Sequence, residues 1–101
     1  MSPQQEVIKV LRRELPHLKE NYGVKEMGIF GSFVRGEATE ESDLDILIEF
    51  EGSISLLKFV ELENYLSELL EVKVDLVMKD ALRPRIGKHI LEEVVYCDIS
   101  F

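Results

Sequence analysis

The sequence GSFVRGEATEESDLDILIEF, residues 31–50, joins a glycine–serine pair to a run in which acidic and apolar residues alternate. From Asp43 to about Phe50, apolar residues recur at every second position. That period is typical of a β-strand with one buried face. Because side chains two residues apart on a strand point to the same face, Asp43 and Asp45 are expected to project together.

The chain before Asp43 predicts a helix, a strand and a short second helix. Residues 4–21 carry apolar side chains at steps of three and four, the spacing of an amphipathic helix, and Pro16 is expected to kink or split it. Residues 24–30 predict a strand, and Phe33 to Arg35 are expected to start a short helix after the turn at residues 31–32. The helical stripe consists of Val7, Leu11, Leu15 and Leu18.

The chain after Phe50 predicts two more helices around a third strand. A helix is expected from about Ser55 to Leu70, and a strand over residues 72–78, in which Asp75 is the only carboxylate. A last helix is expected to begin around residues 83–84, since proline suits the first helical turn. The stripe of this last helix is Ile86, Ile90 and Val94.

The composition bounds the fold class. A chain of 101 residues with 46% hydrophobic and 32% charged residues is expected to form a single domain over residues 1–101. The order of elements predicts an α+β (α/β two-layer) fold, a small sheet flanked by helices. No apolar run approaches bilayer length and no secretory signal is visible, so the cytoplasm is the expected location. The single cysteine, Cys97, excludes an internal disulfide and any multi-cysteine metal site.

Negative charge is concentrated in the middle of the chain. Residues 37–75 carry two Lys or Arg against twelve Asp or Glu, within a net charge of −8. Such a segment repels a phosphate backbone, so no stable direct binding to DNA is expected unless a bound cation reverses the local field.

The carboxylates themselves point to that cation. Asp43 and Asp45 lie roughly 7 Å apart at their Cα atoms on an ideal strand. Like charges this close repel unless a partner neutralises them, and Mg²⁺ prefers oxygen ligands of this kind. If the third strand lies beside the second, Asp75 joins them, and three carboxylates without histidine or cysteine suit phosphoryl or nucleotidyl transfer rather than zinc chemistry. Taken alone, the Asp-x-Asp sequence is also compatible with a simple turn at the start of a strand.

The turn at Gly31–Ser32 supplies a second requirement of that chemistry. Glycine lets a phosphate approach the backbone, and serine adds a hydroxyl at a helix start. Ten residues separate this pair from Asp43, enough for the chain to return along a neighbouring strand. Arg35 is placed either to reach a triphosphate or to pair with an acidic neighbour.

Gly31–Ser32, ten residues and then Asp43-Leu44-Asp45 resemble the signature of the polymerase-beta-like nucleotidyltransferase superfamily. The stretches FGSFVRGEATEESDLDILIEF, VDLVM and LRPRIGKHILEEVVY resemble its minimal branch, the MNT proteins. The resemblance implies a mixed sheet carrying the three aspartates, two Mg²⁺ ions and ATP as substrate. It further implies an antitoxin of a type VII-like HEPN/MNT pair, which transfers AMP from ATP to a tyrosine of its HEPN ribonuclease toxin.

Carried over by position, the resemblance implies a role for each matching residue. Asp43 and Asp45 would hold both metals, and Asp75 would hold one metal and take the proton of the acceptor hydroxyl. Ser32 and the Gly31 backbone would hold the β- and γ-phosphates. Catalysis would consist mainly of positioning and charge neutralisation.

Two alternatives remain open from the sequence. The protein could block its partner by occlusion without catalysis, or it could transfer a nucleotidyl group to a small molecule or an RNA end.

Two further groups of residues are interpreted mainly as solvent-exposed. The histidines His17 and His89 stand alone on helices, and the basic cluster Arg83, Arg85 and Lys88 is a solvated face or, less favourably, a contact to triphosphate or partner.

Overall fold

The computed structural model describes residues 3–39 and 41–97 of the chain. A mixed sheet has the strand order β3-β2-β1-β4, in which β2 and β3 are parallel and β1 is antiparallel to both β2 and β4. The elements are α1 (Pro3–Tyr22), β1 (Val24–Phe30), α2 (Ser32–Arg35), β2 (Leu44–Phe50), α3 (Leu56–Leu70), β3 (Val74–Met78), the 3₁₀ turn η1 (Lys79–Ala81), α4 (Pro84–Glu93) and β4 (Val95–Tyr96).

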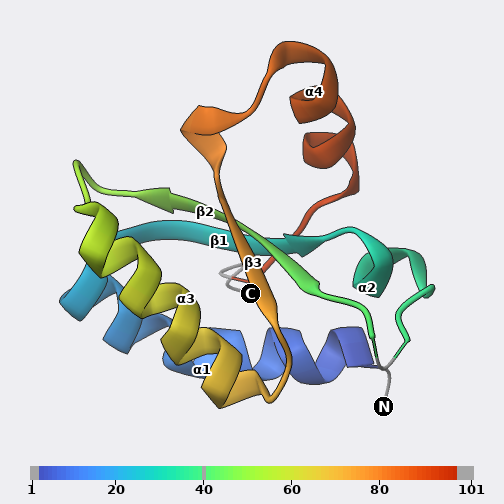
Figure 1. The fold of residues 1–101 in the computed structure, drawn as a ribbon, viewed down its shortest axis with the longest axis horizontal. Helices are drawn as coiled ribbons and strands as arrows, with labels where there is room; N and C mark the ends of the chain where they lie inside the picture. The colour runs from blue at the N-terminus through green and yellow to red at the C-terminus, as the bar shows by residue number, and fades with distance from the viewer. Residues whose placement is uncertain (1–2, 40, 98–101) are drawn as a thin grey trace.

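Helices lie on both sides of this sheet. Figure 1 shows α1 and α3 against one face and α4 on the opposite side. The predicted mixed sheet flanked by helices is therefore confirmed. Among the described helices, none is long and apolar enough to cross a membrane.

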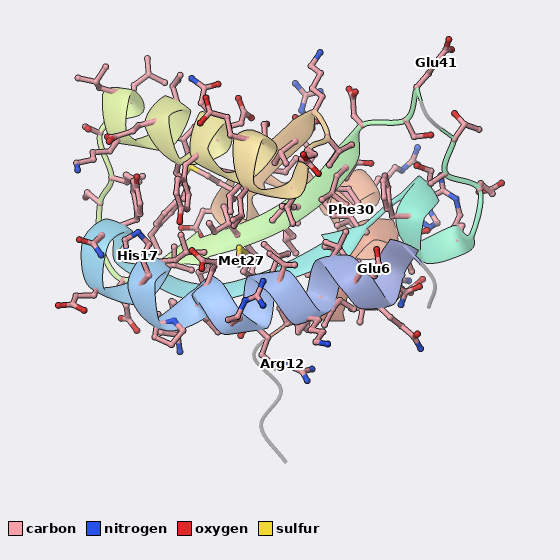
Figure 2. All side chains as sticks on the ribbon, turned by 90° about the horizontal axis from the view of Figure 1, so that it is seen from below. Glu6, Arg12, His17, Met27, Phe30 and Glu41 are labelled. Atoms are coloured by element: carbon pink, nitrogen blue, oxygen red, sulfur yellow. The ribbon has the colours of Figure 1, made fainter. Side chains whose placement is uncertain are left out.

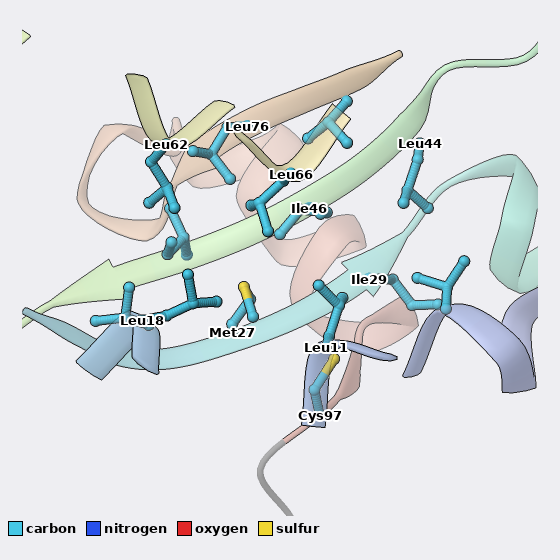
Figure 3. Packing of buried hydrophobic residues seen from close by; sticks show 14 of the residues in the cluster. Leu11, Leu18, Met27, Ile29, Leu44, Ile46, Leu62, Leu66, Leu76 and Cys97 are labelled. Carbon is cyan, nitrogen blue, oxygen red and sulfur yellow. The ribbon is translucent and has the colours of Figure 1, made fainter. Parts of the chain in front are cut away.

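The hydrophobic core lies between the sheet and the pair α1 and α3. Every residue of the predicted α1 stripe is buried, which confirms the 3.6-residue period as the reason this segment is a helix. Met27 of β1 lies between α1 and α3, whereas Arg12 points away from both (Figure 2). The strands contribute Ile29, Leu44, Ile46, Ile48, Val74 and Leu76, and Cys97 is also buried there (Figure 3).

Side chains of α3 protect the edge strand β3. The backbone N–H groups of Val74 and Leu76 point away from β2 and donate to Ser67 Oγ and Glu63 Oε2, each at 3.0 Å. An exposed strand edge is a template for unwanted pairing, and these bonds close it. At the other end of α3, Ser55 Oγ accepts from Lys58 N at 3.2 Å and caps the helix, which starts one residue after the predicted beginning.

The structure corrects the sequence prediction in three places. The prediction was that Pro16 kinks or splits the first helix; α1 is continuous across Pro16, so the split is wrong. The third strand begins at Val74, two residues later than predicted. The last helix ends at Glu93, and Val94 is extended and leads into β4, which pairs with β1.

Candidate active site

Register brings two of the predicted carboxylates together. Asp45 on β2 is the direct partner of Asp75 on β3 and of Phe30 on β1. All three lie on the face of the sheet opposite α1 and α3, because the alternate residues of β2 are in the core. Asp45 is half-buried between its neighbours, whereas Asp75 is exposed at the edge strand.

Asp43 lies at the exposed rim of this group. It directly precedes β2, and its side chain is 46% exposed, with Lys73 Nζ 4.0 Å from its Oδ2. The alternation of β2 places Asp43 on the same side as Asp45. The predicted trio therefore consists of one half-buried carboxylate flanked by two that solvent reaches.

The Gly31 turn packs directly on Asp45. Gly31 has φ 80° and ψ −151°, a conformation that side chains disfavour. A β-carbon built on Gly31 would overlap Asp45 Oδ2, so only glycine allows the turn to approach the carboxylate this closely. The chain therefore does return along the neighbouring strand β2 and brings Asp45 against Gly31.

A carboxylate from α4 completes the arrangement. Glu93 Oε2 accepts a hydrogen bond from Gly31 N at 2.8 Å, and Glu93 Oε1 accepts one from Arg35 Nη1 at 2.8 Å. Arg35 also donates through Nε to Glu37. Of the two roles open to Arg35, pairing with acidic neighbours is thus the one this structure contains.

The sequence reasoning missed Glu93. A signal existed, because Glu93 lies three residues after Ile90 and shares the predicted stripe of the last helix. A carboxylate on the apolar face of a helix indicates a polar partner across that face.

Burial and like charge act together on Asp45. The pKa of Asp45 is raised, first by burial and then by repulsion from Asp75 and Asp43, while Arg35 partly offsets the rise. Glu93 behaves in the opposite way. Burial opposes its ionisation, but the hydrogen bonds from Gly31 N and Arg35 outweigh burial and lower the pKa of Glu93.

The donor set fits a hard divalent cation. In the described part of the chain, no group of three or more His, Cys, Asp or Glu side chains is arranged to hold a metal ion as it stands. Asp43, Asp45 and Asp75 nevertheless provide only oxygen ligands, and the pKa of Asp45 is raised by burial first and then by the negative charge of Asp75 and Asp43, which Arg35 only partly offsets. Mg²⁺ commonly uses one or two protein carboxylates and completes its shell with water and substrate phosphates. The three aspartates could therefore supply the protein ligands of a Mg²⁺ ion whose other ligands are water and phosphate oxygens.

The remaining candidates lie outside this arrangement. His17 is exposed on α1, where it contacts Asn21 and Tyr65, and His89 is exposed on α4. Both positions confirm the solvent-facing prediction. The basic side chains Arg83, Arg85 and Lys88 are also exposed, and Arg83 and Lys88 line an open groove beside η1.

Comparison with known proteins identifies the family of this chain. A family model described as a nucleotidyltransferase domain matches residues 8–97. The protein adenylyltransferase MntA of Thermococcus cleftensis is 54% identical over 92 residues, which cover 91% of this chain and 93% of MntA. A solved structure described as a minimal nucleotidyltransferase has a TM-score of 0.76 at 37% identity, covering 94% of this chain and 95% of that one.

A more distant solved structure shares the fold. It contains a tri-AMPylated HEPN toxin of Shewanella oneidensis in complex with an MNT antitoxin; the match has a TM-score of 0.61 at 20% identity and covers 94% of this chain and 68% of that one. With the family model spanning residues 8–97 and the similarity to MntA covering nearly the whole chain, this protein belongs to the nucleotidyltransferase domain family.

Proposed function

We propose that this nucleotidyltransferase is a Mg²⁺-dependent protein adenylyltransferase that transfers AMP from ATP to a tyrosine of a HEPN-domain partner and thereby neutralises it as an antitoxin. The observation that carries the proposal is the pairing of Asp45 with Asp75 across β2 and β3, with Gly31 packed on Asp45. The similarity to MntA supports protein as the acceptor. The solved complex with an AMPylated HEPN toxin supports the choice of partner.

The proposed step is a displacement at the α-phosphorus of ATP. The tyrosine oxygen forms a bond to that phosphorus, the bond from the phosphorus to the β-phosphate oxygen breaks, and pyrophosphate leaves. Asp75 is suited to take the tyrosine proton because it is exposed at the sheet edge, where a protein acceptor can reach it. Asp45 and Asp43 would hold Mg²⁺ together with Asp75. Bound Mg²⁺ would neutralise the carboxylates and polarise the phosphate oxygens.

The other polar groups of the site are suited to the triphosphate. Ser32 begins α2 directly after Gly31, where helix geometry leaves the first N–H groups without an intrahelical acceptor, and Ser32 adds its hydroxyl. The N–H of Gly31 itself donates to Glu93 Oε2. Arg35 lies one turn further along α2 and carries a positive charge toward the same side as Asp45. Together these groups would orient the phosphates so that the α-phosphorus faces the acceptor.

The charge balance favours catalysis over simple occlusion. An inhibitor that acts only by covering its partner needs no carboxylate in a half-buried position beside two others. Burial and repulsion make the ionised form of Asp45 unfavourable in the folded chain. Carboxylates with such raised pKa values are concentrated at catalytic sites, which favours a catalytic role for Asp45.

Intact-mass spectrometry tests the proposal directly. The HEPN protein encoded nearest to this one is incubated with the chain, ATP and Mg²⁺, with the double variant Asp43→Ala/Asp45→Ala as the control. The expected result is a gain of one or more AMP units on the partner that needs Mg²⁺ and is absent with the double variant. A stable complex in which the partner's mass is unchanged would instead favour occlusion.

A second assay, with radiolabelled ATP, distinguishes the alternative acceptors. Radiolabelled ATP is offered with the partner protein, with total RNA and with an aminoglycoside, and label is followed in each fraction. Label in RNA or the aminoglycoside, with none in the partner, would overturn protein adenylylation and retain nucleotidyl transfer.

A further inference from the structure

One carboxylate of α4 links two groups that the proposed function assigns to the triphosphate. Its two oxygens bind different partners, because Glu93 Oε2 accepts from Gly31 N and Oε1 accepts from Arg35 Nη1. Both backbone polar groups of Gly31 are therefore hydrogen-bonded. Its N–H donates to Glu93, and its carbonyl oxygen accepts from Val34 N at 3.0 Å and Arg35 N at 3.1 Å. The position of the turn relative to Arg35 therefore depends on Glu93.

Glu93 is itself fixed on both sides. It is the last residue of α4, and the chain passes directly into β4, whose residues pair with Gly28 and Ile29 of β1. Val94 packs closely on β1, since a β-carbon on Gly28 would lie 2.7 Å from Val94 Cγ2. The Glu93 side chain is only 23% exposed. A carboxylate anchored in this way has little freedom to follow a moving loop.

Among residues 3–39 and 41–97, the hydrogen bonds of Arg35 leave some of its donors without a partner. Its guanidinium has five N–H donors, of which Nε binds Glu37 and one Nη1 donor binds Glu93. The remaining donors on Nη1 and Nη2 are sufficient for a phosphate. Glu93 is therefore compatible with phosphate binding by Arg35 and fixes the direction from which the guanidinium approaches.

We propose that Glu93 is a positioning residue for nucleotide binding, whose carboxylate holds the Gly31–Ser32 turn and the Arg35 guanidinium in the arrangement that receives the triphosphate. This inference rests on the proposed function, since it takes Ser32 and Arg35, on the turn that Gly31 begins, as the triphosphate-binding groups. It assigns to α4 a part in substrate binding, although Glu93 acts through Gly31 and Arg35 rather than on the nucleotide.

Nucleotide affinity is the first readout. Binding of a non-hydrolysable ATP analogue with Mg²⁺ is measured by calorimetry for the wild type, Glu93→Ala and the matched control Glu92→Ala, whose side chain is exposed on the same turn of α4. Loss of hydrogen bonds to charged groups is expected to weaken affinity about tenfold in Glu93→Ala and to leave Glu92→Ala unchanged. Equal affinity of the two variants would overturn the proposal.

Kinetics and coupling distinguish positioning from general destabilisation. In AMP transfer, Glu93→Ala should raise KM for ATP about tenfold while KM for the protein acceptor stays unchanged. The double variant Arg35→Ala/Glu93→Ala should lose less affinity than the two single losses added together, because part of the effect of Glu93 acts through Arg35. Additive losses, or a fall in kcat with KM for ATP unchanged, would contradict the inference.

A conservative variant covers the case in which Glu93→Ala does not fold. Glu93→Gln keeps an acceptor for Gly31 N but loses the charge that faces Arg35, and about threefold weaker binding is expected. Wild-type affinity in Glu93→Gln would then refute the positioning role. A wild type that binds the analogue but transfers no AMP would overturn the proposed function alone, since the affinity comparison does not depend on an acceptor.

Discussion

On β2, Ile46 faces α1 and α3 and is fully buried, whereas its neighbour Asp45 faces the opposite side of the sheet and is half-buried. Figure 3 shows Ile46 among leucine side chains of the core. Asp45 instead has two carboxylates and the Gly31 backbone around it. Two adjacent residues of one strand therefore serve different purposes. Ile46 contributes to the stability of the core, and Asp45 belongs to the candidate active site.

The second face also contains charged contacts away from Asp45. Lys79 Nζ lies 3.7 Å from Glu26 Oε1 and 3.9 Å from Glu49 Oε1, and it lies over the ring of Tyr96 at 5.8 Å. These groups join β1, β2 and β4 to η1. Polar contacts therefore help to hold this face beside the buried Phe30 and Leu47, whereas the first face is held by close apolar packing.

The largest expected effect is on activity, from Asp45→Ala. Loss of the central carboxylate should lower the rate of AMP transfer by about a thousandfold or more, because electrostatic stabilisation dominates phosphoryl transfer. The melting temperature should stay the same or rise, since a repelled half-buried charge is removed. Transfer assays and thermal unfolding of the same preparation check both statements. Normal AMP transfer by Asp45→Ala would contradict the claim that this face of the sheet carries the catalytic residues.

The neighbouring change, Ile46→Ala, should have the opposite profile. Removing a fully buried side chain from the core is expected to lower the free energy of unfolding by about 2–5 kcal/mol. Transfer activity per folded molecule should remain within about twofold of wild type below the unfolding transition. Urea denaturation measures the first quantity, and initial rates at low temperature measure the second. A selective loss of activity without loss of stability would contradict the comparison.

A smaller effect is expected at the edge of the sheet. Glu63→Ala removes the acceptor for Leu76 N and should cost about 1–3 kcal/mol, because a backbone donor loses its partner. The exposed residue Glu68 on the same helix is the control, and Glu68→Ala should change stability by less than about 0.5 kcal/mol. Hydrogen exchange at Leu76 should increase in the first variant only. Equal protection in both variants would show that α3 does not close this edge.

The smallest effect is a pH dependence from Asp45. Because its folded-state pKa is raised above the ordinary 3.8, the folded chain binds this proton more tightly than the unfolded chain does. Stability due to Asp45 should therefore fall as pH rises from about 3.8 through the folded-state pKa, and stay low above it. Asp45→Asn should melt a few degrees higher than wild type at pH 7 in EDTA, and the gap should close in acid. A gap that widens in acid would contradict the raised pKa.

Much of the fold could be predicted because one face of each long strand is buried. The alternation of Leu44, Ile46 and Ile48 fixed which side of β2 enters the core, and the α1 stripe was buried as expected. Asp45 and Asp75 were placed on the second face by the same argument, and parallel pairing of β2 and β3 then brought them together. The strand order itself could be stated only as a condition, since no local pattern specifies which strands pair.

The missed features depend on contacts between distant residues. β4 comprises only Val95 and Tyr96, too short to show alternation, and it is a strand because it pairs with β1. Glu93 could not be assigned to Gly31 without knowing that α4 lies on the opposite side of the sheet from α1 and α3. Pro16 does not break α1, because Leu15 and Leu18 are buried on either side of it and hold the helix in place.

The hydrogen bond between Gly31 and Glu93 can form only late in the synthesis of the chain. The two residues are 62 positions apart in the sequence. At roughly 5–20 residues per second, a ribosome needs about 3 to 12 seconds to travel from one to the other. The aspartates of β2 and β3 are synthesised within that interval, while the turn at Gly31 still has no partner from α4. A nascent chain therefore carries every predicted metal ligand before it carries the contact that holds Gly31 and Arg35 in place.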